Sequence, residues 1–181
     1  MMSKKLVLIY SSFRKNGNSE RLAKEFERGA LESGLYVQSI FLRDLKYGFC
    51  RGCLACEKTY KCIQKDDIAS VIDIVANADI LAFATPVYYY SVSGQLKTFL
   101  DRMNPIYAAG HKFKTVYLFA TAEENESYVP EGTVSDIQGW VDCFEGVSFP
   151  KTIFCGGVIQ AGDINTKTSA LKEAYDLGKS L

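Results

Sequence analysis

Four of the six cysteines in the chain lie within one short segment, CRGCLACEKTYKC (residues 50–62). The candidate ligands are Cys50, Cys53, Cys56 and Cys62, which are spaced C-x2-C-x2-C-x5-C. A compact loop with this spacing could direct four thiolates at one 4Fe-4S cluster, as iron–sulfur ligation requires. Zinc also accepts four thiolates, although most structural zinc sites use two separate C-x-x-C pairs. Free thiols or a reversible disulfide are the third interpretation, and the spacing leaves all three open.

Hydrogen-bond donors gather in a second segment, SSFRKNGNS (residues 11–19), which follows an apolar run. If a helix begins there, its free N–H groups and the positive end of its dipole suit a phosphate group. The donors are Ser11, Ser12, Arg14, Asn16, Asn18 and Ser19. The segment matches neither G-x-G-x-x-G nor G-x-x-x-x-G-K-[ST], so a phosphate monoester fits better than a dinucleotide or a nucleoside triphosphate. The alternative is that Asn18 or Ser19 only caps the helix.

A third segment, TPVYYYSVSGQLKTFLDR (residues 85–102), places three consecutive tyrosines after Pro86 and Val87. Tyr88, Tyr89 and Tyr90 cannot form one face of an amphipathic helix. Three exposed aromatic rings at the end of a strand would be costly, so we expect a flat molecule to pack against them. An isoalloxazine ring fits, with backbone groups of Pro86 and Val87 at its polar edge and a tyrosine against its face. The tyrosines could instead cover a dimer interface, where Tyr is enriched.

The elements that position these segments alternate along the whole chain. We expect strands at 5–10, 35–42, 79–86, 114–122 and 152–159, the third of them ending at Pro86. Helices are expected at 19–34, 66–78, 93–103, 133–147 and 165–181. Strict alternation predicts a single α/β domain over 1–181, with a doubly wound parallel sheet and helices on both faces. Such sheets bind ligands at the carboxyl ends of their strands, where all three segments would lie.

The composition is that of a soluble globular protein, with 48% apolar residues and 21 residues of each charge sign. Zero formal net charge argues against nucleic-acid and anionic-membrane binding, which rest on a basic surplus. The first apolar run stops after Tyr10 without the features of a signal peptide, and no run approaches the roughly 18 apolar residues of a membrane span. We therefore expect a cytoplasmic protein, in which clustered cysteines are more often ligands or redox groups than structural disulfides.

Three further residues have types that could do chemistry. His111 lies in a stretch that reads as a surface loop. Cys143 falls in a helical pattern and Cys155 in a strand pattern, so both are expected to be small buried hydrophobic residues.

The three segments together resemble the NADPH-dependent FMN reductase group of the flavodoxin-like superfamily, including its iron–sulfur flavoprotein branch. SSFRKNGNS is similar to the family's G-S-P-R-x-x-G-N-[ST] phosphate loop, and residues 85–102 are similar to its S-P-V-Y segment. Residues 50–67 resemble the cysteine loop and the following helix start. The resemblance covers nearly the whole chain, and it implies a flavodoxin-like sheet of order 2-1-3-4-5. Ser11 and Phe13 replace the family's Gly and Pro.

The resemblance implies that residues of the first loop hold the FMN phosphate and that residues 86–90, with Thr121 and Ala122, line the flavin ring. It also implies a homodimer or homotetramer that passes electrons from NAD(P)H to a quinone, azo or nitro compound, to free flavin or to a protein. The alternatives are an iron–sulfur flavoprotein, and an electron carrier without pyridine-nucleotide turnover. After the fourth strand, Glu123 and Glu124 stand where relatives often have a Gly-rich turn, and they would lower the potential of a nearby flavin.

Overall fold

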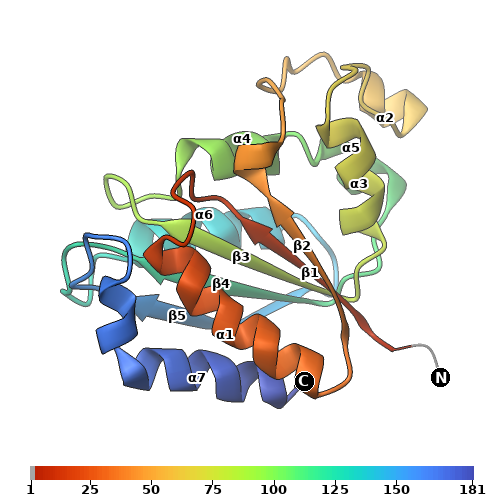
Figure 1. Cartoon of the computed structure of the whole chain (residues 1–181). Coiled ribbons are helices and arrows are strands. Elements are labelled where there is room, and N and C mark those ends of the chain that lie inside the picture. The colour runs from red at the N-terminus through yellow and green to blue at the C-terminus, as the bar shows by residue number, and fades with distance from the viewer. Residues whose placement is uncertain (1–2) are drawn as a thin grey trace.

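The computed structural model describes residues 3–181, so the first two residues of the domain expected over 1–181 lie outside it. Five parallel strands form one sheet in the order β2-β1-β3-β4-β5, which confirms the predicted doubly wound topology (Figure 1). The strands are β1 (Lys5–Tyr10), β2 (Tyr36–Phe41), β3 (Ile80–Pro86), β4 (Thr115–Thr121) and β5 (Ser148–Cys155).

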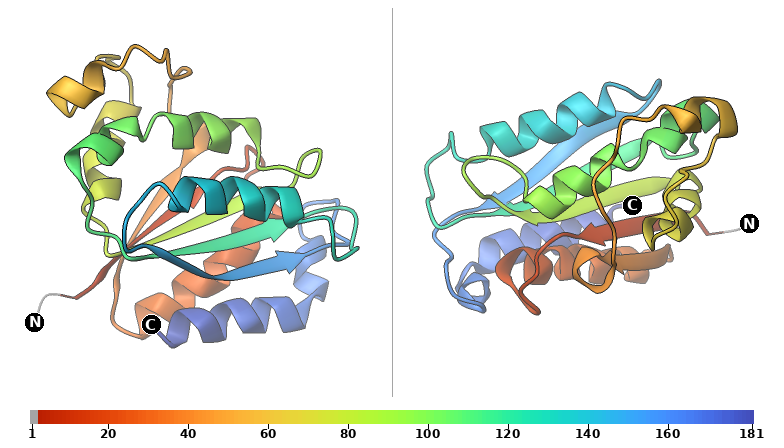
Figure 2. Two further views of the ribbon diagram at one scale, coloured as in Figure 1. Left: turned by 180° about the vertical axis from the view of Figure 1, so that it is seen from behind. Right: turned by 90° about the horizontal axis from the view of Figure 1, so that it is seen from above.

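Helices cover both faces of this sheet, as Figures 1 and 2 show. On one face α1 (Asn18–Glu32) lies beside α7 (Thr168–Lys179). The other face carries α3 (Ile68–Ala76), α4 (Gly94–Asp101), α5 (Asn104–Ala109) and α6 (Glu131–Val141). The short α2 (Ala55–Thr59) stands out from the body of the domain, within the cysteine segment. Over residues 3–181, none of the helices is both long and apolar enough to cross a membrane.

The central strands are apolar on both sides because each side packs against a helical layer. In β1, Leu6 and Leu8 join the core under α1 and α7, whereas Val7 and Ile9 join the core under the other four helices. These side chains are fully buried. Because all the strand pairs are parallel, the loops that follow the strands meet at one edge of the sheet.

The structure differs from the sequence-based expectations mainly at the ends of elements. The last helix before β5 ends at Val141 instead of residue 147, so the prediction that Cys143 is buried is wrong: its side chain is exposed. Cys155 is buried, as predicted. Single turns of 3-10 helix follow β2 (Leu42–Asp44) and precede α7 (Asp163–Thr166). The helices α2 and α5 were not expected, because five or six residues give too little periodicity to detect.

Candidate functional site

The loops after β1, β3, β4 and β5 enclose a cleft at the carboxyl edge of the sheet. Its inner hollow, of about 200 Å³, is lined by Ser12, Arg14, Gly17, Asn18, Ser19, Pro86, Val87, Tyr88, Thr121, Ala122, Glu123, Val158 and Ile159. Its outer hollow, of about 430 Å³, is lined by Val87, Tyr89, Tyr90, Ala122, Glu123, Glu124 and Val129. Both linings include Val87, Ala122 and Glu123, so the two hollows form one cleft. It brings together every residue predicted to bind the cofactor except Ser11 and Asn16.

The inner hollow ends at the N-terminus of α1, where Gly17 is the N-cap residue. A Cβ atom on Gly17 would lie 3.1 Å from the carbonyl oxygen of Arg14 and 3.2 Å from Ser12 Oγ, so any larger residue would require these atoms to shift slightly. Ser12 Oγ accepts a hydrogen bond from the Arg14 N–H at 3.2 Å. The helix end and these hydroxyl groups present hydrogen-bond donors to the hollow, as an anionic ligand requires.

Two of the predicted phosphate ligands also bond to the segment after β5. Arg14 Nη1 donates to the Ile159 carbonyl at 2.8 Å. Asn18 Nδ2 donates to the Gln160 carbonyl at 2.9 Å, and Asn18 Oδ1 accepts from the Ile164 N–H at 3.2 Å. The Asn18 side chain therefore ties α1 to this segment. Sequence reasoning missed this wall of the cleft because residues 156–159 read as the end of a strand, although Gly156 and Gly157 mark the point where β5 stops.

Ser11 and Asn16 shape the loop from outside the cleft. Ser11 is fully buried, its Oγ accepts from Ser93 Oγ at 2.9 Å, and its carbonyl accepts from Gln95 Nε2 at 2.9 Å. Asn16 adopts a left-handed backbone with φ of 56°. Its N–H donates at 3.2 Å to the buried carboxylate of Glu20. Ser11 and Asn16 therefore stabilise the loop, and their placement does not favour direct contact with a ligand.

Glu20 is itself paired with Arg43, which follows β2. Arg43 Nη1 donates to Glu20 Oε2 at 2.6 Å, and the two side chains are only 11% and 7% exposed. This buried pair connects the phosphate-type loop to the neighbouring strand. Nothing in the sequence pattern indicated it, because the partners lie 23 residues apart.

The tyrosines form a tight turn at the outer hollow. Tyr88 and Ser91 exchange two backbone hydrogen bonds of 3.0 and 3.1 Å, and the two residues between them have positive φ, 50° for Tyr89 and 62° for Tyr90. A two-residue turn with both φ angles positive is normally built from Asn and Gly, because a Cβ atom makes this conformation costly. Tyr89 is fully exposed at the tip. The N–H of Val87 donates to the Thr121 carbonyl at 2.8 Å, which bonds the loop after β3 to the end of β4.

Three anchors hold this turn in place. Tyr90 Oη donates to the Glu124 carboxylate at 3.0 Å, and this contact raises the pKa of Tyr90. Asp136 of α6 accepts from Ser91 Oγ at 2.5 Å and from the Val92 N–H at 3.1 Å. A Cβ atom on Gly132 would lie 2.1 Å from the Tyr90 carbonyl oxygen. Backbone strain that neighbouring elements maintain in this way is typical of functional sites.

The four clustered cysteines surround a separate small cavity of about 20 Å³, whose lining also includes Arg102. The Arg102 side chain is fully buried, forks onto Asp66 at 2.7 and 2.8 Å, and donates to Cys62 Sγ at 3.5 Å. Its Nε has no hydrogen-bond partner among the described residues. Burial, and then the neighbouring cysteine sulfurs, raise the pKa of Cys56. Across residues 3–181, no three Cys, His, Asp or Glu side chains converge as metal ligands do.

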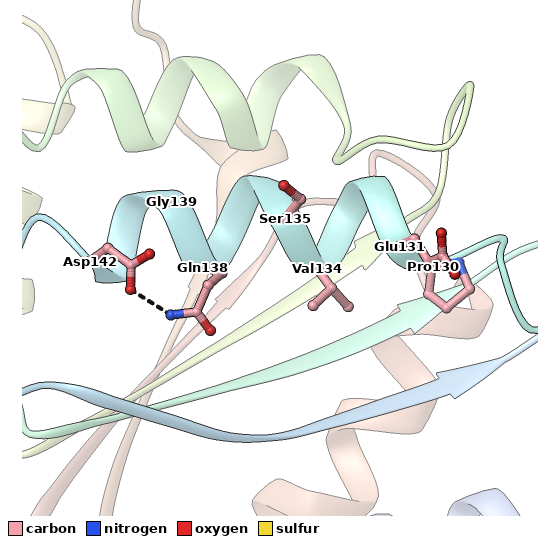
Figure 3. Close-up of a pocket in the computed structure, with 7 residues that line it drawn as sticks. All are labelled: Pro130, Glu131, Val134, Ser135, Gln138, Gly139 and Asp142. Atoms are coloured by element: carbon pink, nitrogen blue, oxygen red, sulfur yellow. Dashed lines mark hydrogen bonds between the residues drawn. The ribbon is translucent and has the colours of Figure 1, made fainter.

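A further hollow, of about 440 Å³, runs along α6 and is lined only by residues 130–142 (Figure 3). Its polar groups include Gln138 Nε2, which donates to Asp142 Oδ1 at 2.6 Å. Because a single helix and the proline before it form the whole lining, no loop from a strand end contributes to it. This hollow therefore offers far less for chemistry than the cleft, where four loops converge.

Comparisons with known proteins were made for the sequence and for the fold. The family model described as NADPH-dependent FMN reductase matches residues 4–129. An iron–sulfur flavoprotein of Archaeoglobus fulgidus is 35% identical over 108 residues, which are 60% of this chain and 48% of that protein. The chain thus spans only about half the length of such relatives. YwqN of Bacillus subtilis, provisionally named an NAD(P)H-dependent FMN-containing oxidoreductase, is 27% identical over 186 residues, with 97% of each chain covered.

Solved structures share the fold across nearly all of the chain. The NAD(P)H:quinone oxidoreductase of Methanothermobacter marburgensis superposes with a TM-score of 0.80 at 18% identity, covering 98% of this chain and 96% of that one. The azoreductase of Bacillus anthracis gives a TM-score of 0.71 at 16% identity, covering 98% and 100%. At this level of identity, the likeness concerns the fold alone.

Proposed function

Because the chain belongs to the NADPH-dependent FMN reductase family, we propose that this oxidoreductase binds FMN in the cleft and passes electrons from NAD(P)H to an acceptor. The observation that carries the proposal is the continuity of the cleft. It begins at a helix N-terminus suited to a phosphate and ends at the aromatic turn of residues 88–91. A flavin mononucleotide has the same layout, an anionic phosphate at one end and a flat ring at the other.

The residues fit the phosphate end of FMN. Gly17 carries no side chain and lines the inner hollow, so the backbone at the first turn of α1 is accessible to a ligand. Ser12, Ser19 and Arg14 line the hollow beside it. Ser12 and Ser19 are almost fully buried, so that a hydroxyl–phosphate contact there would be shielded from water.

The ring end would lie between the loops after β3 and β4, against Pro86, Val87, Tyr88, Thr121 and Ala122. FMN supplies the hydride chemistry at its own ring, and the protein supplies position, exclusion of water and local charge. The chain's residues therefore need not act as acids or bases. NAD(P)H as the reductant, and a quinone or azo compound as the acceptor, follow the names of similar proteins. A nitro compound, free flavin or a protein are further acceptors that the family resemblance implies.

Binding of FMN against riboflavin tests the proposed phosphate site, because riboflavin lacks only the phosphate. We expect the wild-type protein to bind FMN at least about tenfold more tightly, since one charge-assisted hydrogen bond contributes about 1.5–3 kcal/mol. The Arg14→Gln variant should prefer FMN over riboflavin by a smaller factor than the wild-type protein does. Arg21→Gln is the matched control, because Arg21 lies in the adjoining helix α1, pairs with Glu25 and lines neither hollow. Equal affinity for the two flavins would overturn the assignment.

Steady oxidation of NADH or NADPH with an added quinone tests the proposed reaction. Turnover that requires bound FMN supports a reductase. A holoprotein that binds FMN but does not turn over either nucleotide would instead be an electron carrier. Gel filtration of the same sample tests the predicted homodimer or homotetramer.

An iron–sulfur flavoprotein is the second candidate, in which electrons would leave the flavin through a cluster held by Cys50, Cys53, Cys56 and Cys62. Two observations favour it: relatives of that name, and a buried arginine with a free N–H at the cysteine cavity. Such a group suits a net-negative sulfur cluster. Iron and acid-labile sulfide are measured on anaerobically purified protein. Four irons per chain would support this candidate, and protein without iron would exclude it in favour of a loop of thiols, a disulfide or zinc.

A further inference from the structure

We propose that the outer hollow is the acceptor site and that Glu123 and Glu124 select acceptors by charge, favouring neutral or cationic flat molecules over anionic ones. This inference rests on the proposed function. The outer hollow shares three lining residues with the inner one, so a molecule within it would lie beside the ring end of the cleft. Its walls combine Tyr89, Tyr90 and two valines, which suit a flat ring, with two carboxylates.

The carboxylates belong to a backbone that is fixed in place. The Glu123 carbonyl accepts from the Gly157 N–H at 3.0 Å, and the Ala122 carbonyl accepts from the Val158 N–H at 3.0 Å. A Cβ atom on Gly156 would lie 2.2 Å from the Glu124 carbonyl oxygen. The loop after β4 therefore packs directly on the segment after β5, which prevents it from swinging away from the cleft.

The Glu124 side chain is held toward the hollow as well. Tyr90 Oη donates to both carboxylate oxygens, at 3.0 and 3.3 Å, and the ring of Tyr128 lies 6.0 Å from the ring of Tyr90. These contacts join the two loops that flank the outer hollow. The negative charge is thereby kept at the wall of the hollow.

The effect of these carboxylates on a charged acceptor depends on the other charges in the cleft. Among the described residues, the ionised side chains in the two linings are Arg14 in the inner hollow, Glu124 in the outer hollow, and Glu123, which lines both. An anionic acceptor in the outer hollow would face two carboxylates without a cation beside them. Exposed charges at close range typically change binding by about two- to fivefold each, and salt screens the effect.

Reoxidation of photoreduced holoprotein tests the inference without involving NAD(P)H. The acceptors are an uncharged naphthoquinone and its sulfonate. In either case, the quinone takes two electrons from the reduced holoprotein and two protons from the holoprotein and water. It leaves as the hydroquinone, and the holoprotein returns to its oxidised form. The measured quantity is the ratio of second-order rate constants, sulfonate over uncharged, so that a change in flavin potential common to both acceptors largely cancels.

The Glu123→Gln/Glu124→Gln double variant should raise this ratio by about fourfold to twenty-fivefold at low salt. Added KCl should raise the wild-type ratio and leave that of the double variant nearly unchanged. Glu126→Gln is the matched control, because Glu126 is exposed in the same loop but lines neither hollow, and its ratio should equal that of wild type. An unchanged ratio in the double variant would overturn the inference. Failure to bind FMN would instead refute the proposed function, and the two failures are therefore distinct.

Discussion

Glu20 and Arg43 form a buried ion pair whose stability depends on both partners. Glu20 also accepts the Asn16 N–H, so the pair supports the left-handed turn of the loop beside α1. Arg43→Met would leave the Glu20 carboxylate buried without its cation. We expect a loss of about 3 kcal/mol in the free energy of unfolding, measured by urea denaturation.

The double variant Arg43→Met/Glu20→Gln controls for loss of packing around Arg43. It removes the uncompensated charge, so it should recover most of the lost stability. A double variant as unstable as Arg43→Met alone would show that the packing of Arg43, and not the charge of Glu20, is responsible.

The Asp66–Arg102 pair makes the stability of the protein depend on pH. Hydrogen bonds from Arg102 hold the pKa of Asp66 below its ordinary value. A carboxyl group with a lowered folded-state pKa adds stability above its unfolded-state pKa, about 3.9 for Asp, and loses it as the pH falls through the folded-state value. We expect Asp66→Asn to lower the free energy of unfolding by about 3 kcal/mol at neutral pH, because Arg102 stays buried without a counter-ion.

Urea denaturation at several pH values checks this expectation. The difference between wild type and Asp66→Asn should begin to shrink as the pH falls below the unfolded-state pKa of about 3.9, and it should be smallest below the folded-state pKa, where the wild-type carboxyl is protonated too. Asp101→Asn is the control, because the Lys97–Asp101 pair is exposed and adds little. A difference that stayed constant across the acid range would contradict the role of the charge.

At the scale of elements, the contact between α6 and the tyrosine turn depends on the absence of a side chain at Gly132. Gly132→Ala would drive a Cβ atom against the Tyr90 carbonyl, 2.1 Å away, so the turn or the helix must move. We expect a loss of at least about 1 kcal/mol in the free energy of unfolding, measured by thermal or urea denaturation, and slower reoxidation by quinones.

Gly139 offers the matched control on the same helix. A Cβ atom there would meet nothing within 4 Å, so Gly139→Ala should stabilise the protein by about 0.5–1 kcal/mol through helix propensity. If Gly132→Ala and Gly139→Ala changed the free energy of unfolding equally, the close approach of Gly132 to the Tyr90 carbonyl would have no effect on stability.

For the molecule as a whole, the proposed cofactor should act as a ligand that stabilises the folded state. FMN at about 100 times its dissociation constant should add about 2.7 kcal/mol to the free energy of unfolding. Hydrogen exchange should show local protection in residues 11–19, 86–91 and 121–124, which line or adjoin the cleft. The cysteine segment 50–62 surrounds a different cavity, so its hydrogen exchange should change little. Riboflavin, which lacks the phosphate, is the control ligand. Protection of residues 50–62 alone would place the flavin elsewhere.

Much of the architecture could be predicted from the sequence, because alternation of buried strands and amphipathic helices allows few topologies. The cleft could be located for the same reason, since it lies where the strands end. The roles of individual residues were harder to predict. Ser11 looks like a ligand until Ser93, 82 residues away, is placed against it. The sequence likewise does not indicate that Asn18, which lines the cleft, also donates to Gln160, 142 residues away. Cys143 was misplaced because α6 ends sooner than its pattern suggests.

The placement of charge in the cleft also bears on which way round an elongated ligand can enter. Arg14 and the N-terminus of α1 lie at the inner hollow and Glu124 lines the outer one, while Glu123 lines both. A molecule with one anionic terminus gains at the first end and loses at the second, so the reversed pose is disfavoured twice. The cleft thus has a built-in polarity, which sets the direction of such a ligand before any contact with its middle is made.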